Sequence, residues 1–286
     1  ENLITDCSYL YVSRKLNGLN LNTFEWRLRE ERGVPFEQIS GDQARDIEPD
    51  LSLDIKSAAL IKDQGRTINP GRLGKVLALK AAKLGVSFLK AEIAKIKPSS
   101  HGGYDVFTDR GTQTAASVVL TAGVWSAQLL EQLGVRVALE AERGYHLVFK
   151  DPCVNLTHSV LDSDNKFVSS SMEMGMRSAG TAEFAGIDAP PDYRRARVFE
   201  KHAKSLFPKL NIGSIEEWMG RRPSTPDSVP YIGEVPGFPR LFYGFGHGHL
   251  GLTGAPMTAR MVAALVSNEP LNIDMKPYRL DRFYKS

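Results

Sequence analysis

The sequence predicts a mixed α/β fold made of two interleaved domains. From residue 69 to residue 133, the patterns run helix, strand, hairpin, strand, helix, an order typical of the later half of an α/β nucleotide-binding domain. From residue 140 to residue 217, scattered strand-like segments surround one polar helix, which favours an antiparallel sheet. We therefore predict one domain from residues 57–138 and 224–286, and a second from residues 1–56 and 139–223.

Three elements are expected before residue 50. Residues 8–13 alternate in the manner of a strand, and residues 22–32 form a helical pattern that ends at Gly33. Residues 41–48 predict a short helix that Pro49 stops, because proline cannot continue the hydrogen-bond ladder.

The best helical signal in the first third of the chain begins at Asn69, a residue suited to cap a helix, with Pro70 in the first turn. It carries an apolar stripe that faces one side: Leu73, Val76, Leu77 and Leu84. Residues 86–96 then predict a strand, and residues 104–109 and 112–116 a hairpin around Asp109, Arg110 and Gly111.

The middle of the chain contains a short apolar segment, residues 117–122, of the kind found in buried parallel strands. Gly123 ends it, and a helix is expected from 125 to 133. Further on, the sequence predicts strands at 144–149 and 166–169 and a helix at 192–206.

Composition excludes few classes. The chain has 286 residues, 42% hydrophobic and 24% charged, as ordinary globular proteins have. Its net charge of +3 is spread along the chain and argues neither for nor against nucleic acid. We expect no nucleic-acid partner. Cys7 and Cys153 are far apart without metal-binding spacing, which favours free thiols and a cytoplasmic protein. A peripheral position at the inner membrane is the alternative. No apolar run approaches the ~18 residues of a membrane helix.

Two motifs near the C-terminus carry most of the chemical information, residues 218–233 and 242–253. In the first, Arg221 and Arg222 lie between a glycine and a proline, and an arginine held in a rigid turn suits bidentate capture of a carboxylate. The second is a glycine-rich helix start, which offers free N–H groups to an anionic or electron-rich ligand. Its residues 246–251 fit GxGxxG, but only 35 residues follow, too few for a complete dinucleotide-binding unit.

These two motifs resemble the C-terminal part of the FAD-dependent D-amino-acid oxidase and dehydrogenase superfamily. Within it, they look most like the small subunit of D-amino-acid dehydrogenase. Glycine and sarcosine oxidases are relatives. The resemblance implies FAD as the cofactor and an incomplete FAD-binding domain interleaved with an antiparallel-sheet substrate domain. In that family a strand–GxGxxG–helix unit holds the FAD pyrophosphate. Because no second GxGxxG occurs here, we expect an N-terminally truncated chain that binds FAD weakly on its own.

The resemblance also implies site residues. Arg222 would bind the substrate carboxylate, and an interdomain salt bridge is the alternative role for it. The glycine-rich turn would contact the flavin, with His249 also acting in catalysis; a plain turn or a packing role is the alternative. The implied cofactor-binding residues of this turn are Gly246, His247, Gly248, His249, Leu250, Gly251, Leu252 and Thr253.

Other contacts implied by the resemblance lie earlier in the chain. Ala122, Gly123 and Trp125 would lie beside the FAD; the alternative is that they only end a strand. Ile93 would lie near the adenine; the alternative is that it only packs in the core. Tyr145 and Arg177 would face the substrate. We expect no metal, because His247 and His249 have no nearby Cys, Asp or Glu to complete a ligand set.

The implied activity is oxidative deamination of an amino acid, of the D series, by hydride transfer to flavin. Two alternatives stay open: a catalytically inactive fragment or pseudoenzyme, and a subunit of a heteromeric glycine- or sarcosine-type dehydrogenase. The electron acceptor, a quinone or oxygen, is not distinguished by these residues. A homodimer is possible, because missing inner strands would leave edges and apolar faces exposed.

Overall fold

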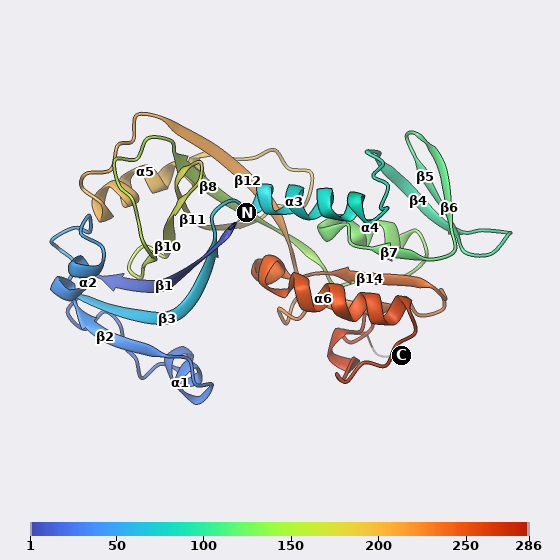
Figure 1. The fold of residues 1–286 in the computed structure, drawn as a ribbon, viewed down its shortest axis with the longest axis horizontal. Coiled ribbons are helices and arrows are strands. Elements are labelled where there is room, and N and C mark those ends of the chain that lie inside the picture. The colour runs from blue at the N-terminus through green and yellow to red at the C-terminus, as the bar shows by residue number, and fades with distance from the viewer. Residues whose placement is uncertain (1, 285–286) are drawn as a thin grey trace. The chain divides into compact units, whose positions relative to one another are not determined.

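The computed structural model describes residues 2–284 and confirms the mixed α/β class (Figure 1). The strands are β1 (Ile4–Ser13), β2 (Phe36–Ser40), β3 (Ser57–Thr67), β4 (Ile93–Pro98), β5 (Tyr104–Thr108), β6 (Gly111–Ala115), β7 (Val118–Leu120), β8 (Glu140–Phe149), β9 (Ser159–Asp162), β10 (Phe167–Met172), β11 (Gly175–Phe184), β12 (Ile215–Ser224), β13 (Tyr231–Glu234) and β14 (Leu241–Phe245). The α-helices are α1 (Phe24–Glu31), α2 (Gly41–Ile47), α3 (Pro70–Lys83), α4 (Ser126–Glu131), α5 (Arg194–Leu206) and α6 (Gly251–Val266). Short 3-10 turns are η1 (Gly123–Trp125), η2 (Gly248–Leu250) and η3 (Lys276–Tyr278).

Contacts divide the chain into two compact units. Unit 1 consists of Glu1–Ser87, Gly144–Ala182 and Pro191–Met219. Unit 2 consists of Phe88–Arg143, Glu183–Pro190 and Gly220–Ser286. The chain passes from one unit to the other within β8, β11 and β12, so these strands contribute residues to both.

Unit 1 is organised by an eight-stranded mixed sheet, in the order β12-β8-β11-β10-β9-β1-β3-β2. The long strand β1 pairs antiparallel with β3, from Ile4 opposite Thr67 to Ser13 opposite Ser57, and parallel with β9. Helix α5 covers apolar side chains of the sheet with one face, through the buried residues Ala196, Phe199, Ala203 and Leu206. This packing gives unit 1 a continuous apolar core.

Helix α3 forms where the sequence predicts it. Asn69 accepts a hydrogen bond from the backbone N–H of Arg72 at 2.9 Å, and Pro70 begins the helix. Its apolar stripe is nevertheless uncovered, since the helix has no buried residue and Leu77 is 61% exposed.

The predicted strand at residues 86–96 is wrong in its first part. Only Ile93–Pro98 forms a strand, β4, which pairs with β5. Among the described residues, no strand pairs with residues 86–92. An apolar segment without a neighbour cannot complete a hydrogen-bond ladder, so its sequence pattern alone does not make a strand.

Unit 2 contains two small three-stranded sheets, β13-β14-β7 and β4-β5-β6. In the first, β7 runs parallel to β14, and β13 runs antiparallel to it. Helix α6 packs against β13 and β14, and only Met261 and Ala264 of this helix are buried. Strand β7 has β14 as its one neighbour within the described sheet, so its other edge is open.

The two units differ from the predicted domains mainly in residues 57–87. This stretch belongs to unit 1, because β3 pairs with β1 along its length, whereas we predicted it beside residues 88–138. The predicted domain boundary between residues 138 and 139 lies close to the unit boundary between Arg143 and Gly144. The assignment of one unit to the cofactor and of the other unit to the substrate stays a prediction.

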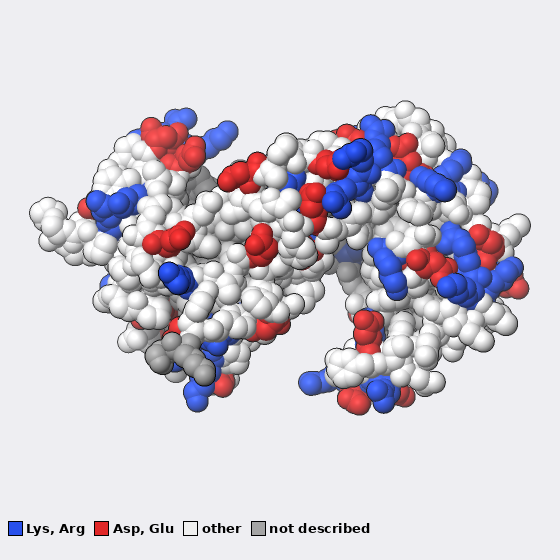
Figure 2. Space-filling view, turned by 180° about the vertical axis from the view of Figure 1, so that it is seen from behind, with Lys and Arg blue, Asp and Glu red and all other residues white. Residues whose placement is uncertain are grey.

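The surface of the described residues carries mixed charge. Figure 2 shows Lys and Arg side chains lying among Asp and Glu on the face drawn. Both cysteines, Cys7 and Cys153, are free. Within residues 2–284, no helix has both the length and the apolar character to cross a membrane.

Candidate active site

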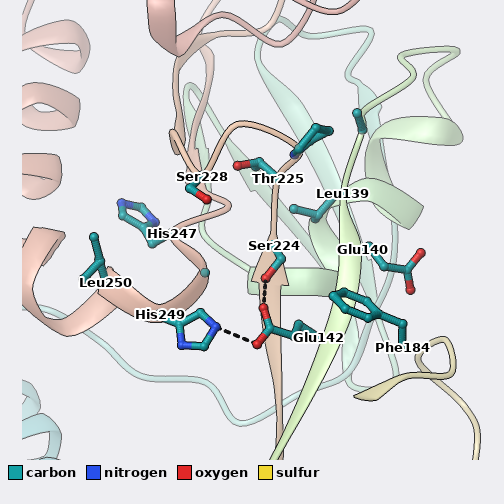
Figure 3. Close-up of a pocket in the computed structure, with 13 residues that line it drawn as sticks. Leu139, Glu140, Glu142, Phe184, Ser224, Thr225, Ser228, His247, His249 and Leu250 are labelled. Atoms are coloured by element: carbon teal, nitrogen blue, oxygen red, sulfur yellow. Dashed lines mark hydrogen bonds and ion pairs between the residues drawn. The ribbon is translucent and has the colours of Figure 1, made fainter. Parts of the chain in front are cut away.

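A cavity of about 760 Å³ opens in unit 2 where three segments meet: the start of β8, the end of β12 and the glycine-rich turn η2. Its polar lining includes Glu140 and Glu142 from β8, Ser224 from β12, and His247 and His249 from the turn (Figure 3). Leu139, Phe184 and Leu250 add an apolar lining. Segments distant in sequence therefore bring acids, imidazoles and apolar groups to one cavity.

Glu142 is the centre of a hydrogen-bonded cluster in this cavity. Its Oε1 accepts from Arg222 Nη1 at 3.2 Å and from His249 Nε2 at 2.6 Å, and its Oε2 accepts from Ser224 Oγ at 2.8 Å. Figure 3 shows Ser224 and His249 approaching the carboxylate from two sides. One carboxylate thus joins β8, β12 and η2.

The surroundings of Glu142 favour its ionised form. Burial by itself would raise the pKa of this carboxyl, but the hydrogen bonds from Ser224 and His249 and the charge of Arg222 outweigh burial. The net result is a pKa below the ordinary value of 4.5. At neutral pH the Glu142 carboxylate is therefore an anion that only accepts hydrogen bonds.

Arg222 reaches Glu142 with a side chain that is 25% exposed, but Arg222 is not among the residues that line the cavity. In the structure its partner is Glu142, within unit 2. The neighbouring Arg221 donates from Nε to the carbonyl oxygen of Ile187 at 2.6 Å, a structural contact. The capture of a substrate carboxylate by Arg222 stays a prediction.

The glycine-rich turn has the backbone that its sequence requires. Gly246 and Gly248 have φ values of 84° and 51°, in the left-handed region that favours glycine. A Cβ at Gly246 would also lie 3.0 Å from a Thr225 carbon. His247 is held by a 2.8 Å hydrogen bond between its Nε2 and Thr258 Oγ1, and burial lowers its pKa. The turn leads directly into the first N–H groups of α6.

A second cavity of about 630 Å³ lies along α6 and β7 in unit 2, and His247 lines both cavities. Small side chains of α6, at Gly251, Ala255, Ala259 and Ala263, leave this cavity open. A helix start stabilises negative charge and small residues leave room for a flat ring, as a flavin site requires. Binding of the flavin by the turn and these two cavities stays a prediction. Among the described residues, no second GxGxxG turn is available for the pyrophosphate.

Of the predicted turn residues, Gly246, Leu252 and Thr253 line neither cavity. The four other predicted cofactor residues lie elsewhere in unit 2. Ala122 and Gly123 follow the edge strand β7, with Gly123 at a φ of 58°. Trp125 is exposed, and Ile93 begins β4 with a partly exposed side chain. None of these four residues lines either cavity, although Thr121, which precedes Ala122, lines the second cavity.

The two predicted substrate residues outside the motifs, Tyr145 and Arg177, belong to unit 1. Tyr145 is completely buried, and its hydroxyl accepts a hydrogen bond from Asp192 N at 3.0 Å. Arg177 lies on β11 opposite Ser170 of β10. Neither belongs to the cluster around Glu142 in unit 2, and their contact with substrate stays a prediction.

Sequence reasoning missed Glu142. The signal was present, because two adjacent charged residues, Glu142 and Arg143, directly precede the predicted strand at 144–149. Arg143 is almost fully buried and donates from Nη2 to the Pro190 carbonyl at 2.7 Å. Burying charges requires partners, so a charged pair in an apolar strand marks a site or an ion-pair cluster.

Within residues 2–284, no group of three or more His, Cys, Asp or Glu could hold a metal ion.

Comparison with curated proteins gives two informative relatives. The D-amino-acid oxidase of Bradyrhizobium diazoefficiens is 36% identical over 266 residues, covering 92% of this chain and 63% of the relative. The D-amino acid dehydrogenase of Allorhizobium ampelinum is 31% identical over 256 residues, covering 88% of this chain and 61% of the relative. This chain thus spans somewhat less than two thirds of the length of these relatives.

Solved structures share the fold. Glycine oxidase from Geobacillus kaustophilus superimposes with a TM-score of 0.83 at 23% identity, covering 98% of this chain and 76% of that one. Glycine oxidase from Bacillus cereus gives a TM-score of 0.84 at 21% identity, covering 99% and 78%. The sequence itself matches the family DAO, described as FAD dependent oxidoreductase, over residues 3–265. The chain therefore belongs to the FAD dependent oxidoreductase family.

Proposed function

We propose that this chain is the catalytic part of an FAD-dependent enzyme that oxidises the amine carbon of a D-amino acid. The observation that carries the proposal is the cluster of Arg222, Glu142 and His249 at a cavity that also contains the glycine-rich start of α6. The names of the relatives, D-amino-acid oxidase and D-amino acid dehydrogenase, support the D series.

In this proposal the chain binds and orients, and the cofactor supplies the redox chemistry. The chemistry that FAD would supply when bound is acceptance of a hydride from the amine carbon. Arg222 binds the α-carboxylate through its guanidinium, which fixes the position of the amine carbon in the cavity. The residues expected at the flavin are the turn from Gly246 to Thr253, whose helix start favours negative charge. Water then hydrolyses the imino acid to a 2-oxo acid and ammonia.

The test is substitution of Arg222 in the full-length, FAD-loaded protein, with D-alanine as the probe. Arg222→Ala should raise KM and lower kcat/KM by an amount equivalent to about 2–5 kcal/mol, the scale of a lost buried charge pair. Arg222→Lys should recover only part, because the bidentate fork is absent. Arg221→Gln is the matched control and should react normally. If both Arg222 variants turn over D-alanine like the unaltered enzyme, the assignment is wrong.

Two further readings are separated by simple measurements. An inactive remnant predicts a full-length protein without the visible absorption of flavin. A subunit of a heteromeric dehydrogenase predicts a second polypeptide that co-purifies. The acceptor of the electrons, oxygen or a quinone, is assigned by comparing oxygen consumption with reduction of a soluble quinone.

A further inference from the structure

The Glu142 carboxylate determines which nitrogen of His249 holds a proton. Because Glu142 is ionised at neutral pH, it can only accept the 2.6 Å hydrogen bond that joins it to His249. Nε2 of His249 must therefore be the donor, and in the neutral imidazole Nδ1 is left as an acceptor. Among the described residues, Glu142 is the one hydrogen-bond partner of this ring, which is 62% exposed.

The same carboxylate oxygen also holds Arg222. Oε1 accepts from both Arg222 and His249, and Ser224 secures the other oxygen. A guanidinium and an imidazole are thus held by one carboxylate, that of Glu142, which lines the cavity together with His249. This arrangement is complementary to the zwitterion of an amino acid, whose carboxylate and ammonium groups are adjacent.

We propose that Glu142 is a positioning residue that presents His249 as the acceptor of the substrate's ammonium proton while it orients Arg222 toward the substrate's carboxylate. This inference rests on the proposed function, since an amine must lose its proton before its carbon can give up a hydride. A carboxylate that orients an imidazole and stabilises the imidazolium is an established arrangement in acid–base catalysis.

The step is a simple proton transfer. The N–H bond of the ammonium group breaks, and an N–H bond forms at Nδ1 of His249. The imidazolium that results is stabilised by Glu142, and the amine keeps its electron pair for the oxidation. No oxidant is needed in this step, and solvent later removes the proton from His249.

Other ionisable groups face the same site and would share in its pH dependence. Glu140 and His247 line the cavity together with Glu142 and His249, and Arg222 reaches the cluster from β12. His247 is occupied by its hydrogen bond to Thr258, and Glu140 accepts from the backbone N–H of Ala141. Neither contacts His249 through a described hydrogen bond, so His249 is the acceptor that the geometry favours.

The experiment measures kcat/KM for D-alanine against pH in the full-length, FAD-loaded enzyme and its variants. His249→Ala should lower kcat about 10²-fold or more, the usual contribution of a general base, and added imidazole should restore part of it. Glu142→Gln should lower kcat at least about tenfold and displace the acidic limb of the pH profile, whereas Glu142→Asp keeps the profile. A purely structural role predicts no rescue by imidazole and an unshifted profile, and that result would overturn the proposal.

Binding of propionate, which has a carboxylate but no amine, separates this inference from the proposed function. His249→Ala should leave its dissociation constant within about threefold, while Arg222→Ala should weaken binding at least about tenfold. If Arg222→Ala binds propionate normally and turns over D-alanine normally, the proposed function itself is contradicted. Impaired Arg222→Ala with unimpaired His249→Ala and Glu142→Gln contradicts only the inference. His101→Ala, in an exposed loop, and Glu216→Gln, in an exposed ion pair with Lys150, are the controls.

Discussion

Helices α5 and α6 bury their apolar side chains to different degrees. In unit 1, α5 has 13 residues with a polar outer face, and its four buried residues pack into the main core. In unit 2, α6 is longer and more apolar, with 16 residues, yet only two are buried and Leu252 and Met257 are 52% and 49% exposed. A helix this apolar normally has neighbours on more than one side.

Helix α3 and strand β7 show the same incomplete burial as α6. The apolar stripe of α3 ends at Leu84, which is 77% exposed, and Val86 and Phe88 beyond it are exposed too. Strand β7 pairs parallel to β14 on one edge, although parallel strands are normally covered on both faces and paired on both edges. The described residues therefore complete the core around α5 but leave apolar faces of α3, α6 and β7 exposed.

The largest expected effect compares one buried with one exposed side chain. Phe199→Ala on α5 should lower the free energy of unfolding by about 3–5 kcal/mol, because it leaves a cavity in a filled core. Leu252→Ala on α6 should change it by less than about 0.5 kcal/mol, since the side chain is half exposed and alanine is also a good helix former. Urea denaturation followed by circular dichroism measures both. Equal losses would show that α6 is covered in solution.

The next effect depends on the contrast between Glu48 in unit 1, whose pKa is raised, and Glu142 in unit 2, whose pKa is lowered. Burial raises the pKa of Glu48, in unit 1, to about 7, and its Oε1 accepts a 2.6 Å hydrogen bond from His158 N. The folded state therefore binds this proton more tightly than the unfolded state, whose pKa stays near 4.5. Stability should be highest below pH 4.5 on account of this group and fall as pH rises through about 7.

Glu48→Gln removes that ionisation and keeps the acceptor for His158. At 1.36 kcal/mol per pKa unit, the variant should be more stable than the unaltered chain at pH 8 by about 3 kcal/mol, with no gain at pH 4. Denaturation midpoints at several pH values measure the difference. Glu37→Gln, which alters an exposed pair with Lys62, is the control and should leave the pH dependence unchanged. A Glu48→Gln variant with the same pH dependence as the unaltered chain would disprove the buried-acid assignment.

The smallest effect on stability probes the uncovered face of α6. Leu252→Gln combined with Met257→Gln should change the unfolding free energy by less than about 1 kcal/mol. It should, however, reduce binding of a hydrophobic dye and any self-association seen in sedimentation, because exposed apolar area is removed. Val198→Gln, at an exposed apolar position on α5, is the matched control and should reduce dye binding less. No reduction by the α6 pair would mean that another surface binds the dye.

Elements with strong local signals were predictable from the sequence. Asn69 and Pro70 mark the start of α3, the polar helix at 192–206 is found as α5, and the hairpin at 104–116 forms β5 and β6. Each depends on capping, turn residues or periodicity, which act over a few residues. Strands β2 and β3 were not predicted, since β3 pairs with the distant β1 and β2 pairs in turn with β3.

The sequence by itself determined the family resemblance, the arginine pair, and the glycine-rich turn, because each depends on residue type and spacing within one segment. The tertiary structure alone decided that Arg222 and His249 meet on one carboxylate, Glu142, which lies 80 and 107 positions away in the chain. It also decided that Tyr145 is a core residue of unit 1 and that residues 86–92 form no strand. The physical reason is the same in each case: a charge, a hydroxyl or a strand edge is satisfied by whichever group the fold brings near, and sequence distance does not record that.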